Sequence, residues 1–191
     1  MLAEYGFDAA GRQFRLHSPR GDWVVVDVQT SDVSTHSRPL FFINAGYTMG
    51  PRWNWDRSVA VRARDAPAVE DCLWRTRIDP RNGDRANRWV VESDAALRDV
   101  LEEVAHVLRE EVPSLVRLLD RGHLRDLSDQ EAGLGYATWQ IKAWLLAEDG
   151  KTSELETILK SLEDDDEEDS LFQAMRRLAA SREGRSPSGD G

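Results

Sequence analysis

The period of the hydrophobic pattern changes once along the chain, near Ser93. Before Ser93, apolar and polar side chains alternate in several segments, which predicts half-buried β-strands. These segments are 12–18, 22–30, 40–48 and 70–79, with a shorter fifth strand expected at 88–93. After Ser93, apolar residues recur every three or four positions, the spacing of one helix face. Strands first and helices later predict an α+β fold, with a mainly antiparallel sheet of four to five strands covered on one face by helices.

The first helix is expected to start at Ser93, whose hydroxyl can cap it. Its apolar stripe should face the sheet, and Pro113 is expected to end or kink the helix at about Glu111. A short helix should then follow and end near Gly122. The stripe consists of Leu97, Leu101, Val104, Leu108 and Val112.

Two capping-box patterns predict where later helices begin. Ser128 is followed three residues later by Glu131, and Ser153 by Glu156, a spacing at which both side chains satisfy backbone amides of the first turn. A last amphipathic helix should carry Leu171, Phe172, Met175 and Leu178.

The expected boundaries give two units and a tail. Residues 1–127 form the α+β domain, residues 128–182 a C-terminal helical subdomain, and residues 183–191 a disordered tail. Residues 49–70 break the alternation and are expected to be a long irregular insertion between the third and fourth strands.

Charge is unevenly divided along the 191 residues, whose net charge is −10. Residues 1–92 hold 13 arginines against 12 acidic residues, whereas residues 93–191 hold 12 basic against 23 acidic residues and net −11. This excess disfavours nucleic acid as a partner, because neutralising phosphates needs basic residues. It favours a basic protein partner, attracted by electrostatic steering. The alternative is that the charge serves solubility alone.

Cys72 is the only cysteine, which excludes an internal disulfide and is typical of a cytoplasmic protein. Its place in the predicted fourth strand, pointing to the same side as Trp74, favours a buried thiol. No apolar run reaches the ~18 residues that a membrane span needs, and we expect no membrane partner and no secretory signal. Of the 25 basic residues 22 are arginine, a bias typical of a GC-rich bacterial genome.

Short motifs follow one another in an order that can be compared with known families. LAEYGF comes first, then GRQFR, a strand ending in VQTS, LFFINAGYT, DCLWRTRI and VPSLVRLL. Over roughly residues 2–127 this series resembles domain-of-unknown-function family 4304. The resemblance implies the fold but no known activity and no catalytic residues. The chain departs from the family in lacking most of the helix that precedes Gly6, and in a segment 49–70 rich in Trp and Arg.

The fourth strand places two arginines, Arg75 and Arg77, on one face of the sheet, together with Asn44 and Trp23. Two guanidiniums ~6–7 Å apart along a strand can clamp an anion or an acidic segment. The alternative is cross-strand pairing with acidic residues of the same face, Asp27 and Asp79. The opposite face should form the core with Phe14, Leu16, Val24, Val26, Val28, Phe41, Ile43, Tyr47, Trp74 and Ile78.

Trp53 and Trp55 lie beside Arg52 and Arg57 in the predicted insertion. Tryptophan and arginine dominate the hot spots of protein interfaces, so this segment is a candidate recognition surface. The alternative is that both tryptophans fold back and cover the sheet.

No pattern of catalytic or metal-ligating residues stands out. The four histidines lack ligand spacing, residues 163–169 (EDDDEED) lack the pattern of a calcium loop, and no nucleophile elbow or phosphate loop occurs. We therefore expect no catalytic residue, no metal and no cofactor. The expected function is a non-enzymatic protein-binding module, for example an immunity- or antitoxin-like protein that sequesters a basic partner. The alternative is a small-ligand binder or enzyme that uses the arginine-bearing sheet face.

Overall fold

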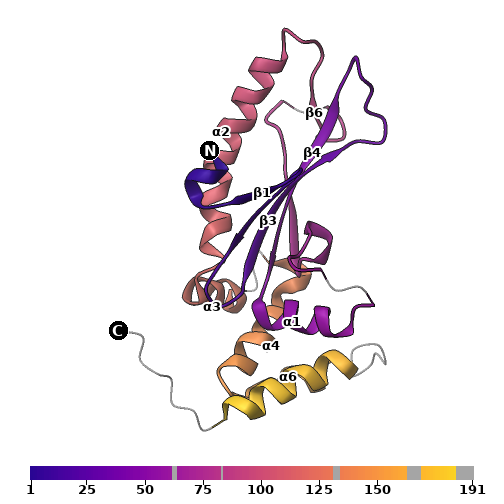
Figure 1. The fold of residues 1–191 in the computed structure, drawn as a ribbon. Helices are drawn as coiled ribbons and strands as arrows, with labels where there is room; N and C mark the ends of the chain where they lie inside the picture. The colour runs from indigo at the N-terminus through magenta and orange to yellow at the C-terminus, as the bar shows by residue number, and fades with distance from the viewer. Residues whose placement is uncertain (62–63, 83, 131–133, 163–168, 184–191) are drawn as a thin grey trace.

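One antiparallel sheet runs through the molecule in the order β1-β2-β3-β4-β5, and β6 pairs with the first residues of β4. The computed structural model describes residues 1–61, 64–82, 84–130, 134–162 and 169–183, and Figure 1 shows their arrangement. The strands are β1 (Asp8–Ala10), β2 (Gln13–His17), β3 (Trp23–Thr30), β4 (Leu40–Thr48), β5 (Trp74–Ile78) and β6 (Trp89–Val90). The predicted α+β fold with an antiparallel sheet is confirmed.

The strands differ from the expected segments mainly at their ends. All three residues of β1 are exposed, so no hydrophobic pattern marks this strand in the sequence. The expected strand 70–79 begins only at Trp74, because Val69–Asp71 forms a short 3-10 helix, η2. The N-terminal helix η1 (Leu2–Tyr5) ends at Gly6, which takes the left-handed conformation expected of a helix stop.

One face of the sheet forms the core, as the alternation predicts. Val24 lies between Leu16 and Tyr47 in a cross-strand row, and both Val24 and Tyr47 are fully buried. Helix α2 (Leu97–Arg117) packs against this face, and its second half contributes the buried residues Val107, Leu108, Val112 and Leu115.

Helix α2 continues through Pro113, so the prediction that it ends near Glu111 is wrong. Proline removes one backbone hydrogen bond, to the carbonyl of Arg109. Val112 and Leu115, on either side, are buried, and this packing holds the helix together. The separate short helix expected after Pro113 is the last part of α2.

The first turns of α2 are less buried than the apolar stripe predicts. The helix begins at Leu97 rather than at Ser93, and Leu97 and Leu101 are 43% and 56% exposed. In Figure 1 these turns stand apart from the strands, so they have little of the sheet to pack against. The apolar stripe predicted from the sequence therefore extends beyond the part of α2 that is buried in the fold.

Residues 50–59 form helix α1 (Gly50–Val59), so the expected irregular insertion is wrong there. Pro51 occupies the first turn, where proline loses no hydrogen bond. Arg52 Nε donates to Asp56 Oδ2 over 2.9 Å, one turn later. Trp53 is buried, which fixes the helix against the body of the protein.

Helix α3 (Arg121–Asp129) begins at Arg121. A helix was predicted to end near Gly122, so the prediction is reversed at this point. The carboxylate of Asp120 accepts the backbone N–H groups of Gly122 and His123 and so caps the helix. Ser128, the expected start of the next helix, lies inside α3 and donates its hydroxyl to the carbonyl of Arg125 over 2.8 Å.

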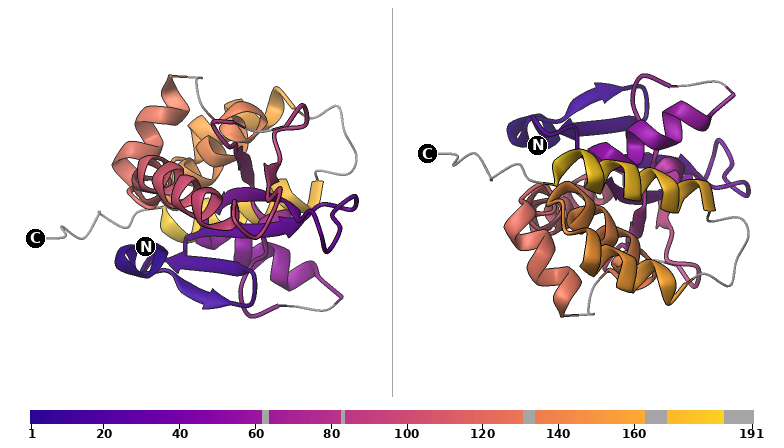
Figure 2. Two further views of the ribbon diagram at one scale, coloured as in Figure 1. Left: turned by 90° about the horizontal axis from the view of Figure 1, so that it is seen from above. Right: turned by 90° about the horizontal axis from the view of Figure 1, so that it is seen from below.

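Three further helices pack together beyond one end of the sheet, as Figures 1 and 2 show. They are α4 (Thr138–Glu148), preceded by the short 3-10 helix η3 (Gly135–Ala137), α5 (Thr152–Lys160) and α6 (Asp169–Arg182). The expected disordered tail lies outside the described residues from 184 onward. Within the described part of the chain, no helix has the length and apolar character needed to cross a membrane.

A single cluster of buried side chains joins the sheet to the C-terminal helices. Helix α4 is central to it and buries Ile141, Trp144 and Leu145. The division into domains at 127/128 stays a prediction, and the buried cluster extends across that boundary.

Candidate functional site

The sheet face opposite α2 carries polar residues in cross-strand rows. One row runs from β2 to β5 through Gln13, Asp27, Asn44 and Arg77. In the next row Arg75 lies beside Gly46. The two arginines are thus on the face that the alternation predicts, and the strand order places them on the last strand of the path.

Arg75 and Arg77 are both exposed, and neither makes an ion pair or hydrogen bond with the residues that the structure describes. The guanidinium of Arg77 lies 4.0 Å from the ring centre of Phe42, a cation–π contact that orients it over the sheet. The alternative that the arginines pair with Asp27 or Asp79 is not what the structure shows. Their charges are therefore free to meet a ligand.

A groove of about 780 Å³ lies over this part of the open face. Three of the six residues predicted for binding, Asn44, Arg75 and Arg77, line it together. Asn44 donates from Nδ2 to Gln29 Oε1 over 3.0 Å, so its amide is held in place. Acidic groups also line the groove, namely Asp27, Glu70 and Asp79.

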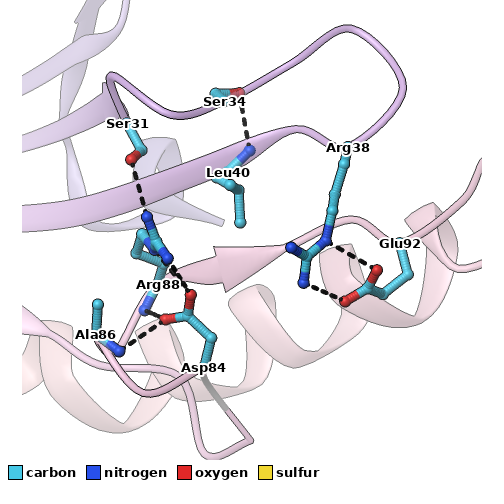
Figure 3. Close-up of polar contacts among 8 residues, drawn as sticks. All are labelled: Ser31, Ser34, Arg38, Leu40, Asp84, Ala86, Arg88 and Glu92. Carbon is cyan, nitrogen blue, oxygen red and sulfur yellow. Dashed lines mark hydrogen bonds and ion pairs between the residues drawn. The ribbon is translucent and has the colours of Figure 1, made fainter.

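Ala86 and Asn87, just before β6, line one side of the groove. One ion pair and one hydrogen bond tie the chain on either side of β6 to the β3–β4 loop (Figure 3). Arg38 binds Glu92 with two hydrogen bonds of 2.8 and 3.0 Å, which lowers the pKa of Glu92. Arg88 donates to Asp84 over 2.8 Å and to Ser31 over 3.5 Å. The hydrogen bond from Arg88 lowers the pKa of Asp84 to about 2.

Another part of the open face is covered by η2 and Cys72. A Cβ atom added at Gly46 would lie 2.7 Å from the Cβ of Cys72, so glycine is required for this close approach. Arg15 Nε donates to the carbonyl of Pro67 over 2.7 Å and holds the same segment. Cys72 therefore lies on the arginine side, and the prediction that it points to the core face with Trp74 is wrong. The thiol is buried, as expected, and burial raises its pKa to about 12.

The three tryptophans predicted for binding lie away from the groove lining. Trp23 stacks on His17 at the start of β3, with 5.0 Å between the ring centres. Trp53 is buried, and Trp55 is partly buried with the guanidinium of Arg52 4.8 Å from its ring centre. The α1 tryptophans thus take part in packing, which was the alternative to a recognition surface.

Comparison with models of protein families identifies the family. The model described as Domain of unknown function (DUF4304) matches residues 1–163, most of the chain. The chain belongs to this family. The match confirms the resemblance seen in the motif order, and it continues past residue 127 to include α4 and α5. No curated protein and no solved structure matches the chain.

A buried ion-pair cluster in this DUF4304 chain connects three elements. Arg121 at the start of α3 donates from Nη2 to Asp22 Oδ1 over 2.7 Å and lies 3.0 Å from Glu148 Oε2 of α4. Asp22 Oδ1 also accepts the backbone N–H of Gly50, at the start of α1, over 2.8 Å. Asp22 is 0% exposed and Arg121 5%. The cluster therefore holds the start of β3 against two helices of the DUF4304 fold.

Tyr47 of β4 lies close enough to this cluster for the charges of Asp22, Arg121 and Glu148 to affect its pKa. Burial raises the pKa of the Tyr47 phenol, and it also raises the pKa of Glu148. Because Asp22 and Arg121 are enclosed, we assign the cluster to the architecture of the DUF4304 chain rather than to ligand binding.

Metal-ligating side chains do not gather in the described part of the DUF4304 chain: it contains no group of three or more that could hold an ion. His106 Nε2 lies 3.5 Å from Glu110 Oε1 in an exposed pair on α2. The acidic run 163–168 lies outside the described residues.

No pattern in the sequence predicted the role of Arg121. Asp22 belongs to a turn and Glu148 to a helix end, so no local pattern relates them to Arg121. One signal was available in the sequence: leucines, Leu118 and Leu124, lie three residues to either side of Arg121, and the structure buries both. A charge at that spacing from two leucines lies on the apolar face of its segment and requires an interior partner.

Proposed function

We propose that this chain is a non-enzymatic protein-binding module whose binding surface is the arginine-bearing open face of the sheet. The observation that carries the proposal is that Arg75 and Arg77, next-but-one neighbours on the same face of β5, are exposed and make no ion pair with the described residues. Guanidiniums of this kind supply charge-assisted donors for carboxylates. Arginine is also among the side chains most enriched in binding hot spots.

The acidic half of the chain supports another form of the proposal, in which an immunity- or antitoxin-like protein sequesters a basic partner. Six of the acidic residues behind the charge of −11 lie within 163–168. On the described part of the chain, several carboxylates already have basic neighbours, as Glu110 has Arg81 and Glu156 has Arg176. This pairing reduces the charge that the helices offer to a partner, so we place the principal surface on the sheet.

The test is affinity purification of a tagged copy from its native host at low salt, with mass spectrometry of what is retained. The sheet-face variant is Arg75→Ser/Arg77→Ser. The matched control is Arg98→Ser/Arg109→Ser, which removes the same charge from exposed positions of α2. We expect one stoichiometric protein with the wild type and the control, none with the sheet-face variant, and weaker retention as salt rises.

A protein retained equally by all three forms would place the interface elsewhere and contradict this surface. The groove of about 780 Å³ favours one further candidate, binding of a small anionic molecule between Arg75 and Arg77. Native mass spectrometry of the purified protein separates the two: a small bound anion with no protein partner would support the small-ligand alternative.

A further inference from the structure

Strand β5 lies at an edge of the sheet. It follows β4 at the end of the strand order, and in the part of the chain that the structure describes no strand pairs with its outer side. An edge strand presents backbone N–H and C=O groups that lack partners. Such groups can form hydrogen bonds with another extended segment, which then adds a strand to the sheet.

A cavity of about 610 Å³ opens beside this edge, between β5 and the helices α2 and α3. Three of the leucines that line it, Leu115, Leu118 and Leu134, are buried, so its floor is apolar. Its polar lining combines the bases Arg77, Arg117 and His123 with the acids Asp79 and Glu111. The volume and the apolar floor suit the side chains of a bound segment.

The two sides of β5 differ in chemistry, and this difference specifies the segment. Trp74, Thr76 and Ile78 point to the core side and line the cavity, whereas Arg75 and Arg77 start from the open side. Arg77 also reaches the rim of the cavity, so its charge lies between the cavity and the open face. We infer that the β5 edge binds an extended peptide segment with alternating apolar and acidic residues. Its apolar side chains enter the cavity and its carboxylates lie beside the two arginines. The inference rests on the proposed function and names the partner's binding segment.

Charge also selects between a partner and a second copy of the chain. If two β5 edges paired, the open side of the joined strands would bring arginines of one copy next to arginines of the other. Like charges on neighbouring strands destabilise the pairing, and basic edge strands avoid self-association in this way. An acidic segment instead supplies the charges that Arg75 and Arg77 lack among the described residues.

The test uses the full chain and a synthetic peptide of alternating glutamate and valine, capped at both ends. The comparison peptide has the same composition with its glutamates in one block and its valines in another. Binding is followed by NMR through the backbone amides of Trp74–Ile78. Ser114→Trp fills the cavity from an exposed position of α2, and Arg109→Trp adds the same side chain elsewhere on α2.

We expect the alternating peptide to shift the β5 amides and the block peptide to leave them unchanged. Ser114→Trp should abolish binding and Arg109→Trp should not. Arg75→Ser/Arg77→Ser should weaken binding by about tenfold, the loss of two exposed charge pairs. Equal binding of both peptides, binding that survives Ser114→Trp, or no binding at all would overturn the inference.

The two levels of the proposal fail separately. If neither peptide binds but a cellular partner still depends on Arg75 and Arg77, the protein-binding function stands and the added-strand geometry is wrong. If the cellular partner is also indifferent to both arginines, the open face is not the interface and both proposals fail.

Discussion

The guanidinium of Arg121 and the carboxylate of Asp22 lie 2.7 Å apart in the interior, although 99 residues separate them in the chain. A buried charge is stable only with partners that compensate for lost hydration. Arg121 has two such partners, Asp22 before β3 and Glu148 in α4. The pair therefore connects the sheet to the helices through a contact that is costly to break.

Arg121→Met should destabilise the fold strongly, because it leaves the Asp22 carboxylate buried without its counter-charge. We expect a loss of about 3–5 kcal/mol in the free energy of unfolding, measured by urea denaturation. Arg125→Met is the matched control, since Arg125 binds Asp149 at the same distance of 2.7 Å but on the surface. That change should cost about 1 kcal/mol or less. Equal losses in the free energy of unfolding would show that the buried pair stabilises the fold no more than the surface pair does.

Gly46→Ala should destabilise the protein although alanine is the smallest possible side chain. The added Cβ would meet the Cβ of Cys72 at 2.7 Å and its Sγ at 2.8 Å. Overpacking of this kind costs about 1–3 kcal/mol. In a Cys72→Gly background the same substitution should cost less, because the opposing atoms are gone. A double-mutant cycle on thermal unfolding measures the coupling, and additive effects would contradict the predicted contact.

Asp84 should make stability depend on pH in the acid range. Its pKa is lowered in the folded protein, from 3.8 to about 2, chiefly by the hydrogen bond from Arg88. The stabilisation is therefore complete above the higher value and is lost as the pH falls through the lower one. The melting temperatures of Asp84→Asn and wild type should differ at about pH 6, and the difference should shrink between about pH 4 and pH 2.

The matched experiment for Asp84 removes the cause of its shift. In an Arg88→Met background, Asp84→Asn should have a smaller effect at neutral pH and a weaker dependence on pH. An unchanged dependence would mean that Arg88 is not the origin of the lowered pKa.

Two leucines of α2 that share one apolar stripe should respond differently to truncation. Leu101 is 56% exposed, whereas Leu108 is 6% exposed. We expect Leu101→Ala to change the free energy of unfolding by about 0.5 kcal/mol or less, and Leu108→Ala to lower it by about 2–5 kcal/mol. Chemical denaturation measures both, and comparable losses would show that the first turns of α2 are covered in solution.

The fold was largely predictable because its elements depend on local periodicity. Alternation located β2, β3 and β4 closely, since each strand turns apolar side chains to the core, as Phe14, Val24 and Ile43 do. It did not reveal β1, whose residues are all exposed. The errors at Pro113 and Ser128 share a cause: a local signal for a helix end or start was outweighed by buried neighbours or by the cap at Asp120.

The candidate site was predictable in part. Alternation is enough to place Arg75 and Arg77 on one face, but their position on an edge strand depends on strand order, which no local pattern records. Trp53 and Trp55 were ambiguous for a related reason: their burial depends on α1 packing against distant parts of the chain. The ion pair of Asp22 and Arg121 joins segments with no sequence relation, so only the fold reveals it.

The buried cluster also sets an order of events during synthesis. Glu148 follows Arg121 by 27 residues, which at about 5–20 residues per second leave the ribosome roughly one to five seconds later. Asp22 and the strands that surround it have been made by then, so Arg121 can meet its first carboxylate before the second exists. The synthesis of α4 therefore supplies the last carboxylate that Arg121 contacts in the native fold.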